Sequence, residues 1–328
     1  MTRALALLYR VLYQGVLSRL PEPTAVAVGQ QALRVLPWDR VPAFRREDPR
    51  LAVTLGGVQL PNPLILAAMY YDTRILRRAM GLGFGAVTAK SITTEPRPGH
   101  PQPNLVRRTS AAGPGLVNCN GFANPGLVRF REAVRDVPHR VPLIVSVAGE
   151  SAEDYVTLVR GLAAYGDLVE FNVSSPNTKL VYGWATRPRE LRAMLEAVRA
   201  ATSKPLVLKL SPDFAEANER DIVPAALEAG IRVVIYGNAR RIAEPRLSQG
   251  AGGLSGPEIF PATLEHVRAI RKRFGDALDI IATGGVDAPD KALALLDEGA
   301  TAVGYFTGFI TRGPILARQI LDALLARR

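Results

Sequence analysis

Short apolar, β-branched runs alternate with amphipathic stretches from Leu51 to the end of the chain. The runs have the length of buried strands, and the stretches between them have the period of helices. The eight predicted strands are Leu64–Ala68, Ala86–Lys90, Leu143–Val147, Leu168–Val173, Leu206–Leu210, Val233–Tyr236, Ile280–Thr283 and Ala302–Tyr305. Helical patterns between them include Ala152–Ala164, Arg189–Ala200, Ala217–Ala229 and Lys291–Glu298. This alternation predicts an α/β fold, the (β/α)8 TIM barrel.

A doubly wound parallel sheet would show a similar alternation of strands and helices. That fold places a G-x-G-x-x-G phosphate loop after its first strand, and no such motif follows Ala68. The barrel is therefore preferred. The one break in the pattern is the stretch from Lys90 to Leu143. We interpret it as a long loop rich in proline and glycine, followed by a helix near Pro125–Val134.

The first forty residues form a separate N-terminal segment, ahead of a main domain at 41–328. Apolar residues recur at helical spacing from Met1 to Leu20, namely Leu5, Leu8, Leu12, Val16 and Leu20. Pro21 and Pro23 are expected to end this helix, and Thr24 to cap a second helix that reaches Leu36. The apolar runs are too short for a transmembrane helix, and no signal peptide is expected. The pair of helices is either a cap on a barrel end or a basic amphipathic hairpin on an acidic bilayer.

The chain is basic, with 41 Lys and Arg against 30 Asp and Glu in 328 residues, a formal charge of +11. Such a charge favours anionic partners, or else reflects an arginine-rich solvated surface. Aromatic residues make up only 6%, so base stacking has little material and no nucleic-acid partner is expected. One cysteine excludes an intrachain disulfide, and the three scattered histidines lack metal-binding spacing, so no metal site is expected.

Polar side chains gather where the predicted strands end, which in such barrels is the face that carries the active site. They are amides, hydroxyls and two lysines: Lys90, Ser91, Ser146, Asn172, Lys209, Asn238 and Thr307. Carboxylates are missing from this set, which argues against a glycosidase pair. Amides and lysines suit a planar, neutral or anionic ligand with several hydrogen-bonding edges.

The last strands are followed by glycine-rich segments, at Gly252–Gly256, Gly284–Gly285 and Phe306–Gly308. Loops after the seventh and eighth strands of such barrels frequently hold a phosphate through main-chain N–H groups. Glycine lets the backbone approach that phosphate closely. We therefore expect a phosphorylated ligand here, with ordinary turn chemistry as the alternative.

Several motifs resemble the dihydroorotate dehydrogenase family. They are Asn172-Val-Ser-Ser-Pro-Asn-Thr178, Val207-Leu-Lys-Leu-Ser-Pro-Asp213, Gly252-Gly-Leu-Ser-Gly256, Ala89-Lys-Ser-Ile-Thr-Thr-Glu-Pro-Arg97 and Leu116-Val-Asn-Cys-Asn-Gly-Phe122. The resemblance runs from about Leu51 to the C-terminus, and the helical N-terminal segment resembles the membrane-associated, quinone-linked branch (class 2). It implies an FMN-containing barrel that oxidises dihydroorotate to orotate and passes electrons to a membrane quinone. A peripheral position on the cytoplasmic face of the cell membrane is expected, with a soluble cytoplasmic protein as the alternative.

The resemblance also implies a role for each matching residue. Ser175 would be the base that takes the C5 proton of the substrate. The substrate would be held by Asn118, Asn172, Asn177, Thr178 and Asn238. The FMN-binding set would be Ala67, Ala68, Lys90, Ser91, Ser146, Asn172, Lys209, Gly256, Gly284, Gly285, Phe306 and Thr307. Within it, the two lysines lie against the flavin, and the last residues bind its phosphate. Cys119 does not align with the base and is expected to be a buried small side chain.

Two departures from the family pattern bear on substrate and acceptor. The quinone-linked branch has an A-A-G-F-D-K-type run where this chain reads Ala67-Ala-Met-Tyr-Tyr-Asp-Thr73, and T-N-T becomes Gly237-Asn-Ala239. Lys90 instead resembles the soluble branches (class 1). Alternatives are thus a related FMN barrel with another dihydropyrimidine or a soluble acceptor, or a non-catalytic flavin- or phosphate-binding protein at the membrane. A tRNA-dihydrouridine-type reductase should show a catalytic cysteine after its asparagine, which is absent here.

Overall fold

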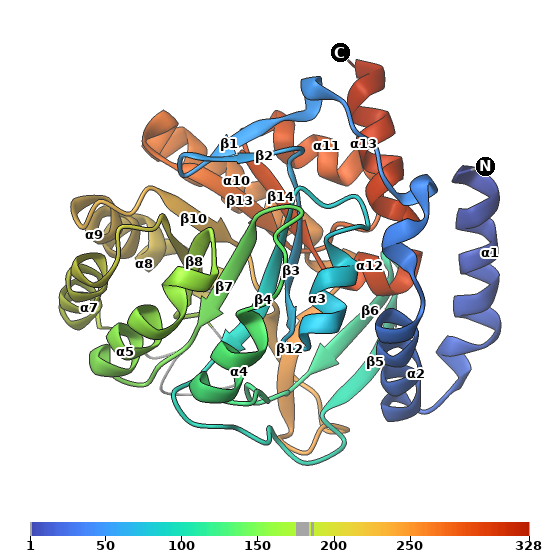
Figure 1. The fold of residues 1–328 in the computed structure, drawn as a ribbon, viewed down its shortest axis with the longest axis horizontal. Coiled ribbons are helices and arrows are strands. Elements are labelled where there is room, and N and C mark those ends of the chain that lie inside the picture. Colours follow the sequence, from blue (N-terminus) through green and yellow to red (C-terminus); the bar gives the residue numbers. More distant parts are fainter. Residues whose placement is uncertain (1, 175–183, 185–186, 328) are drawn as a thin grey trace.

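Eight parallel strands close into a barrel in the computed structural model, which describes residues 2–174, 184 and 187–327. Around the barrel the strands follow chain order: β3 (Leu64–Tyr70), β4 (Ala86–Ile92), β7 (Leu143–Val147), β8 (Leu168–Asn172), β9 (Leu206–Leu210), β10 (Val233–Tyr236), β13 (Asp279–Thr283) and β14 (Ala302–Tyr305). Helices surround them (Figure 1). The predicted (β/α)8 barrel is confirmed, with every predicted strand in place.

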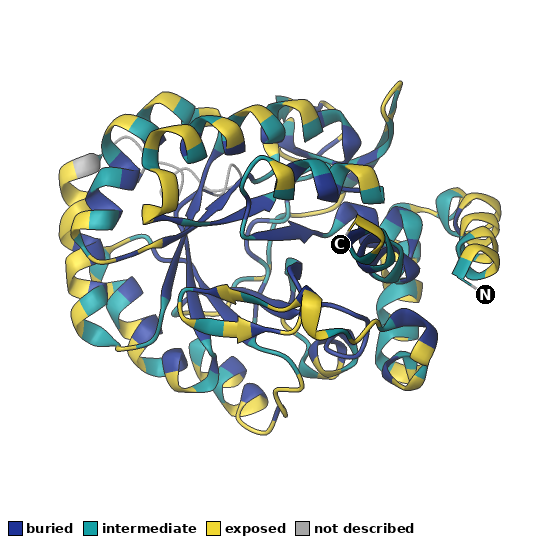
Figure 2. Cartoon of the chain, turned by 90° about the horizontal axis from the view of Figure 1, so that it is seen from above, coloured by how far each residue is buried: buried dark blue, intermediate teal, exposed yellow. Residues whose placement is uncertain are grey.

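The outer helices turn apolar faces to the barrel and polar faces to solvent, as the banded colouring in Figure 2 shows. Their bounds are α3 (Thr73–Ala79), α4 (Leu127–Val134), α5 (Ala152–Leu162), α7 (Pro188–Ala201), α8 (Ala215–Ala217), α9 (Val223–Glu228), α10 (Phe260–Phe274), α11 (Pro289–Asp297), α12 (Thr307–Arg312) and α13 (Ile315–Arg327). The single helix predicted over Ala217–Ala229 is interrupted by a π-helical turn at Asn218–Ile222. Pro224 follows this turn and has no N–H, so it cannot continue the i→i−4 ladder.

The N-terminal end of the barrel is closed by apolar side chains. Leu55 and Leu60 come from a hairpin of β1 (Val53–Leu55) and β2 (Val58–Leu60), and they pack against the interior residues Ile65, Leu168 and Val207. All five side chains are almost fully buried. Because this end is filled, the interior is polar only toward the other end, where the strands terminate.

A second sheet lies beside the barrel, and the sequence analysis missed it. Its order is β11 (Arg240–Ala243), β12 (Ala251–Ser255), β6 (Gly113–Asn118) and β5 (Leu105–Ser110), all antiparallel. The stretch after Lys90 is therefore not a simple loop, and Gly252–Ser255 lies in the strand β12. Gly115 shows why glycine is needed in this sheet: a Cβ there would lie 2.7 Å from the Ser255 carbonyl oxygen.

The N-terminal segment forms two helices, α1 (Thr2–Gly15) and α2 (Glu22–Val35), which confirms the predicted extension. The predicted cap is wrong, because α2 already begins at Glu22 and contains Thr24. Pro23 lies in the first turn of α2, where a missing N–H costs no hydrogen bond. No described helix is long and apolar enough to cross a membrane. The boundary at residues 40 and 41 stays a prediction.

Specific contacts attach this hairpin to the barrel. The Tyr9 hydroxyl donates to the Ile310 carbonyl oxygen at 2.7 Å. The Tyr9 ring packs against Gly313, where a Cβ would lie only 2.5 Å from Tyr9 Cγ. Arg107 on β5 donates to the carbonyl oxygens of Leu17 and Leu20, both at 2.9 Å. The hairpin is thus tied to α12 at one end and to the second sheet at its turn, and both helices stand at one side of the barrel (Figure 1).

Asp39 supports our first prediction. Its carboxylate is 4% exposed and accepts hydrogen bonds from Arg78 and, at 3.0 Å, from Arg140. Replacing Asp39 with asparagine is expected to lower the free energy of unfolding at pH 7 by about 2 kcal/mol, because two guanidinium groups lose their counter-charge and remain partly solvated. Urea denaturation measures this effect. Asp276→Asn, at a fully exposed side chain, is the control and should change stability little.

The ion pair between Asp39 and Arg78 also predicts that the stability of the fold depends on pH. Burial disfavours the charged carboxylate, but the hydrogen bond and charge of Arg78 outweigh it, so the pKa of Asp39 lies below its usual value. A lowered folded-state pKa stabilises the fold above the unfolded-state value of about 3.9, and this contribution is lost as the pH falls through the folded-state value. The stability difference between wild type and Asp39→Asn should therefore shrink below about pH 4. A constant difference down to pH 2.5 would contradict this account.

Candidate active site

Four strand ends bring predicted site residues together at the C-terminal mouth of the barrel. The Ser91 and Ser146 hydroxyl oxygens, at the ends of β4 and β7, lie 2.8 Å apart. The Asn172 amide nitrogen, at the end of β8, donates to Ser91 Oγ at 3.0 Å. Ser174 and Asn238 continue this chain of contacts, with 2.9 Å between Asn238 Nδ2 and Ser174 Oγ. Neighbouring parallel strands end at one edge, which is why residues far apart in sequence meet here.

Glu170 is a site residue that the sequence analysis missed. Its carboxylate is 1% exposed, accepts a hydrogen bond from Ser146 at 2.7 Å and lies 3.9 Å from the Lys209 ammonium. The expectation that carboxylates are absent from this face is therefore wrong. The signal was available, because Leu168, Glu170 and Asn172 alternate along β8 and share its inward face.

Lys90 is a buried cation, only 8% exposed. Burial lowers its pKa to about 8, since desolvation disfavours the ammonium form. Lys209 has Glu170 as a counter-charge, whereas Lys90 has no hydrogen-bond or ion-pair partner within residues 2–174, 184 and 187–327. A buried ammonium without a partner is costly in an isolated protein, so this position is suited to a ligand that carries negative charge.

The run that departs from the family pattern lies where β3 loses regular pairing with β4. The register of the β3–β4 pairing shifts between Leu66 and Tyr70. The residues between them, Ala67, Ala68 and Met69, are half-buried. Tyr70 is buried and packs edge-on against Phe306, with ring centroids 5.3 Å apart. The bulk of Tyr70 is thus accommodated by an aromatic pair next to α12, while Ala67 and Ala68 remain partly accessible.

The predicted phosphate-binding glycines have positive φ values and close neighbours that a side chain would not tolerate. Gly284 and Gly285 have φ values of +144° and +77°, and a Cβ on them would lie 2.4 Å from Thr263 Oγ1 and 2.6 Å from Phe260, respectively. Gly256 has φ +114°, and a Cβ there would meet Gly115. These contacts require glycine for packing alone, so phosphate binding by Gly256, Gly284, Gly285, Phe306 and Thr307 stays a prediction. The Thr307 hydroxyl donates to Ser255 Oγ at 2.9 Å.

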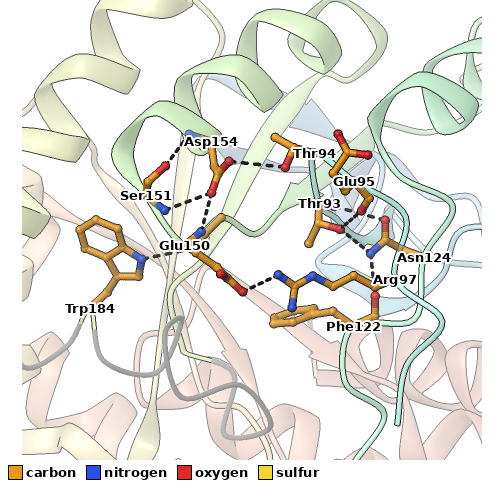
Figure 3. A network of polar contacts seen from close by, with 11 residues as sticks. Thr93, Thr94, Glu95, Arg97, Phe122, Asn124, Glu150, Ser151, Asp154 and Trp184 are labelled. Atoms are coloured by element: carbon orange, nitrogen blue, oxygen red, sulfur yellow. Dashed lines mark hydrogen bonds and ion pairs between the residues drawn. The ribbon is translucent and has the colours of Figure 1, made fainter.

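The loop after β4 is held by the network in Figure 3, which includes residues that the sequence analysis did not single out. The Asn124 amide donates to Thr93 Oγ1 at 2.9 Å and to the Phe122 carbonyl oxygen at 2.6 Å. Arg97 pairs with Glu150 at the start of the loop before α5. These contacts fix the segment that follows Asn118 and contains Phe122, which has a positive φ of 56°.

The remaining predicted residues are Asn118, Cys119, Ser175, Asn177 and Thr178. Asn118 ends β6, opposite Leu105 and Gly253 in the second sheet. Cys119 is buried, as expected. Ser175, Asn177 and Thr178 lie outside the described residues.

Comparison with known proteins decides the family. A family model described as dihydroorotate dehydrogenase matches residues 50–327, which includes every barrel strand and every residue of the cluster above. The chain belongs to the dihydroorotate dehydrogenase family. The prediction of an oxidoreductase is confirmed, and the alternative of a non-catalytic binding protein is set aside.

Similar proteins indicate the branch of this family. A relative from Leifsonia xyli subsp. xyli named dihydroorotate dehydrogenase (quinone) is 35% identical, over 98% of this chain and 99% of its own length. One of the same name from Clavibacter sepedonicus is 34% identical, over 98% of both chains. The crystal structure of DHODH from Eimeria tenella in complex with ferulenol has a TM-score of 0.83 and 26% identity, and covers 96% of this chain and 94% of that one. The predicted quinone-linked class is thereby confirmed.

Proposed function

We propose that this protein oxidises dihydroorotate to orotate with FMN as its cofactor and delivers the electrons to a membrane quinone. Family membership supports the reaction, and the names of the relatives support the acceptor. The observation in this chain that carries the proposal is Lys90, a buried ammonium without a partner among the described residues, beside a cluster of amides and hydroxyls. A planar ligand rich in carbonyl oxygens and bearing negative charge complements this set.

The residues present fit FMN. Lys90 would supply a cation, while Ser91 and the small, half-buried Ala67 and Ala68 would line the ring at the barrel mouth. Lys209 lies across the barrel, paired with Glu170. The phosphate would be held by Gly256, Gly284, Gly285, Phe306 and Thr307. When bound, FMN would supply the acceptor for the hydride that leaves C6 of the substrate.

The chain's own residues would then bind the substrate and move one proton. Ser175 takes the C5 proton while the C6 hydride leaves, so that the C5=C6 double bond forms. A serine hydroxyl is a weak base, so it must pass its own proton onward as it accepts this one. Asn172 donates a hydrogen bond to a substrate oxygen, with Asn118, Asn177, Thr178 and Asn238 completing the set. Lys90 balances the negative charge.

Anaerobic titration of the purified protein with dihydroorotate tests this function. We expect a yellow protein whose flavin absorbance bleaches in proportion to the dihydroorotate added. A yellow protein that stays oxidised would overturn the substrate assignment and leave the cofactor. A colourless protein that does not take up FMN would overturn both.

The N-terminal hairpin is proposed to lie peripherally on the cytoplasmic face of the membrane, where quinone is available. Apolar residues of α1 remain exposed, namely Leu7 at 60%, Leu8 at 65%, Val11 at 61% and Leu12 at 45%, and so does Val16, just beyond the helix, at 50%. The predicted apolar stripe is therefore divided, because Leu5 packs onto the core while Leu8, Leu12 and Val16 face outward. An exposed apolar face on a helix that carries arginines suits an anionic bilayer surface.

Replacing both Leu8 and Val11 with glutamine is expected to weaken binding to anionic phospholipid vesicles at least tenfold, since each buried side chain contributes about 1.5 kcal/mol or more. Vesicle co-sedimentation measures this effect, and turnover with a vesicle-bound quinone should fall with it. Val128→Gln is the control, because Val128 is 58% exposed but lies on α4. Flavin reduction by dihydroorotate should be unchanged in both. Equal vesicle binding by all three proteins would defeat the membrane assignment.

A further inference from the structure

The hydrogen bonds across the barrel mouth have one common direction. An ionised carboxylate only accepts, so Ser146 donates its single hydroxyl proton to Glu170. Ser91 must then donate to Ser146, and its oxygen accepts from the Asn172 amide nitrogen. Each hydroxyl has one proton, so the direction of the first bond fixes that of the next.

The same direction continues beyond Asn172. The Asn172 amide oxygen accepts both the N–H and the O–H of Ser174, at 3.3 and 3.2 Å. The Ser174 oxygen accepts from the Asn238 amide nitrogen, and the Asn238 amide oxygen accepts from the Ala239 N–H at 2.8 Å. Every donor therefore points along the chain toward Glu170, and bonds aligned in this way polarise one another.

This arrangement restricts what the two amides can offer a ligand. Both lone pairs of the Asn172 oxygen are occupied by Ser174, so only its second N–H remains available. The Asn238 amide nitrogen donates to both the carbonyl oxygen of Ser174, at 3.2 Å, and Ser174 Oγ, so Asn238 holds Ser174 in place. A ligand atom facing the Asn172 amide must be an acceptor, such as a carbonyl or carboxylate oxygen.

We infer that Glu170 is a positioning residue that orients the Asn172 amide, through Ser146 and Ser91, so that it donates a hydrogen bond to an oxygen of the substrate. This role rests on the proposed function, because it takes orotate and dihydroorotate as the ligands. Glu170 is itself 1% exposed and lies behind the serines, so it acts without touching the ligand. Its essential property is an acceptor oxygen at the end of the chain, and its distance of 3.9 Å from Lys209 makes that ion pair secondary.

Three variants test whether orotate binding depends on the acceptor oxygen of Glu170 or on its negative charge. Ser146→Ala breaks the chain and keeps the Glu170–Lys209 pair, Glu170→Gln keeps an acceptor oxygen and removes the charge, and Glu170→Leu removes both. The measurement is the Kd of orotate for the oxidised FMN-loaded protein, read from the change in flavin absorbance. We expect Ser146→Ala and Glu170→Leu to raise this Kd about tenfold, as for the loss of one buried hydrogen bond, and Glu170→Gln to stay within about threefold of wild type.

The controls distinguish this role from a general structural one. Thr311→Ala removes a buried hydroxyl that bonds the Thr307 carbonyl oxygen on α12, away from the chain, and should leave the Kd unchanged. FMN content and thermal stability are measured for each protein, and the orotate Kd is determined on protein that has been loaded with FMN to full occupancy. If Glu170→Leu does not fold, Ser146→Ala still decides the point.

Two results would overturn the inference while the proposed function stands. The first is an orotate Kd in Ser146→Ala equal to that of wild type. The second is a Glu170→Gln variant that binds orotate as weakly as Glu170→Leu does, which would assign the effect to the negative charge that Glu170 presents to Lys209. Failure of the wild-type protein to bind orotate, while it still binds FMN, would overturn the proposed function itself, and this inference with it.

Discussion

Ser175→Ala is expected to yield a folded protein that binds FMN but whose flavin is reduced by dihydroorotate about 10²- to 10⁴-fold more slowly than in wild type. Removal of a positioned general base produces losses of this size, because the C5 proton then has to leave to water. The residue follows Ser174, whose hydroxyl accepts from Asn238 at the barrel mouth. Anaerobic stopped-flow absorbance measures the rate of this half-reaction directly.

Ser175→Cys is the matched control for this prediction. A cysteine thiol ionises more readily than a serine hydroxyl, so it is expected to restore part of the rate at a pH near its pKa. Orotate affinity should be similar in all three proteins. Reduction of the alanine variant at the wild-type rate would remove Ser175 as the base.

Lys90→Met is expected to lower the reduction potential of the bound flavin by about 30–60 mV. A hydrogen bond to a charged group contributes about 1.5–3 kcal/mol, and 1.4 kcal/mol corresponds to about 30 mV for a two-electron couple. The direction follows from charge, because a cation stabilises the reduced, anionic form more than the oxidised one. Spectroscopic titration against a reference dye measures the potential.

Lys90 also predicts the pH dependence of FMN binding. Burial holds the pKa of its ammonium near 8 in the protein without ligand, and an anionic ligand favours the protonated form. FMN affinity should therefore be nearly constant below about pH 8 and fall by up to tenfold for each pH unit above it. Lys90→Met should lack this fall, whereas Lys204→Met, ahead of β9 at the opposite end of the barrel, should show it unchanged. Identical pH profiles in Lys90→Met and wild type would contradict the assignment.

The barrel strands could be predicted because each is a short, buried run, with a helix between it and the next barrel strand. The second sheet could not. Gly113-Pro-Gly115 and Gly252-Gly253 have weak strand propensity, and the β5–β6 and β11–β12 pairs join through β6 and β12, which are far apart along the chain. No local pattern contains this pairing between β6 and β12.

Only part of the candidate site could be predicted, because the rest depends on contacts between residues that are far apart along the chain. Polar residues at the strand ends are visible in the sequence, and Ser91, Ser146, Asn172 and Asn238 do meet. Glu170 lies two residues inside β8, so the rule that places site residues at strand ends does not find it. Lys209 is paired, whereas Lys90 has no partner in the part of the chain that the structure describes, and this difference depends on which side chains face each other across the barrel, which no local pattern contains.

The contact between Tyr9 and Gly313 has a consequence for how this chain can change over evolution. The ring occupies the space that a side chain at position 313 would need, and its hydroxyl is bonded to the Ile310 carbonyl oxygen. Because φ at Gly313 is also +84°, a side chain there would be strained even with a small residue at position 9, so glycine is required at 313 both by the backbone and by the ring. An N-terminal hairpin grafted from a relative would dock only if its own residue at position 9 matched this surface. The hairpin and the C-terminal part of the barrel are thus inherited together, and not as exchangeable modules.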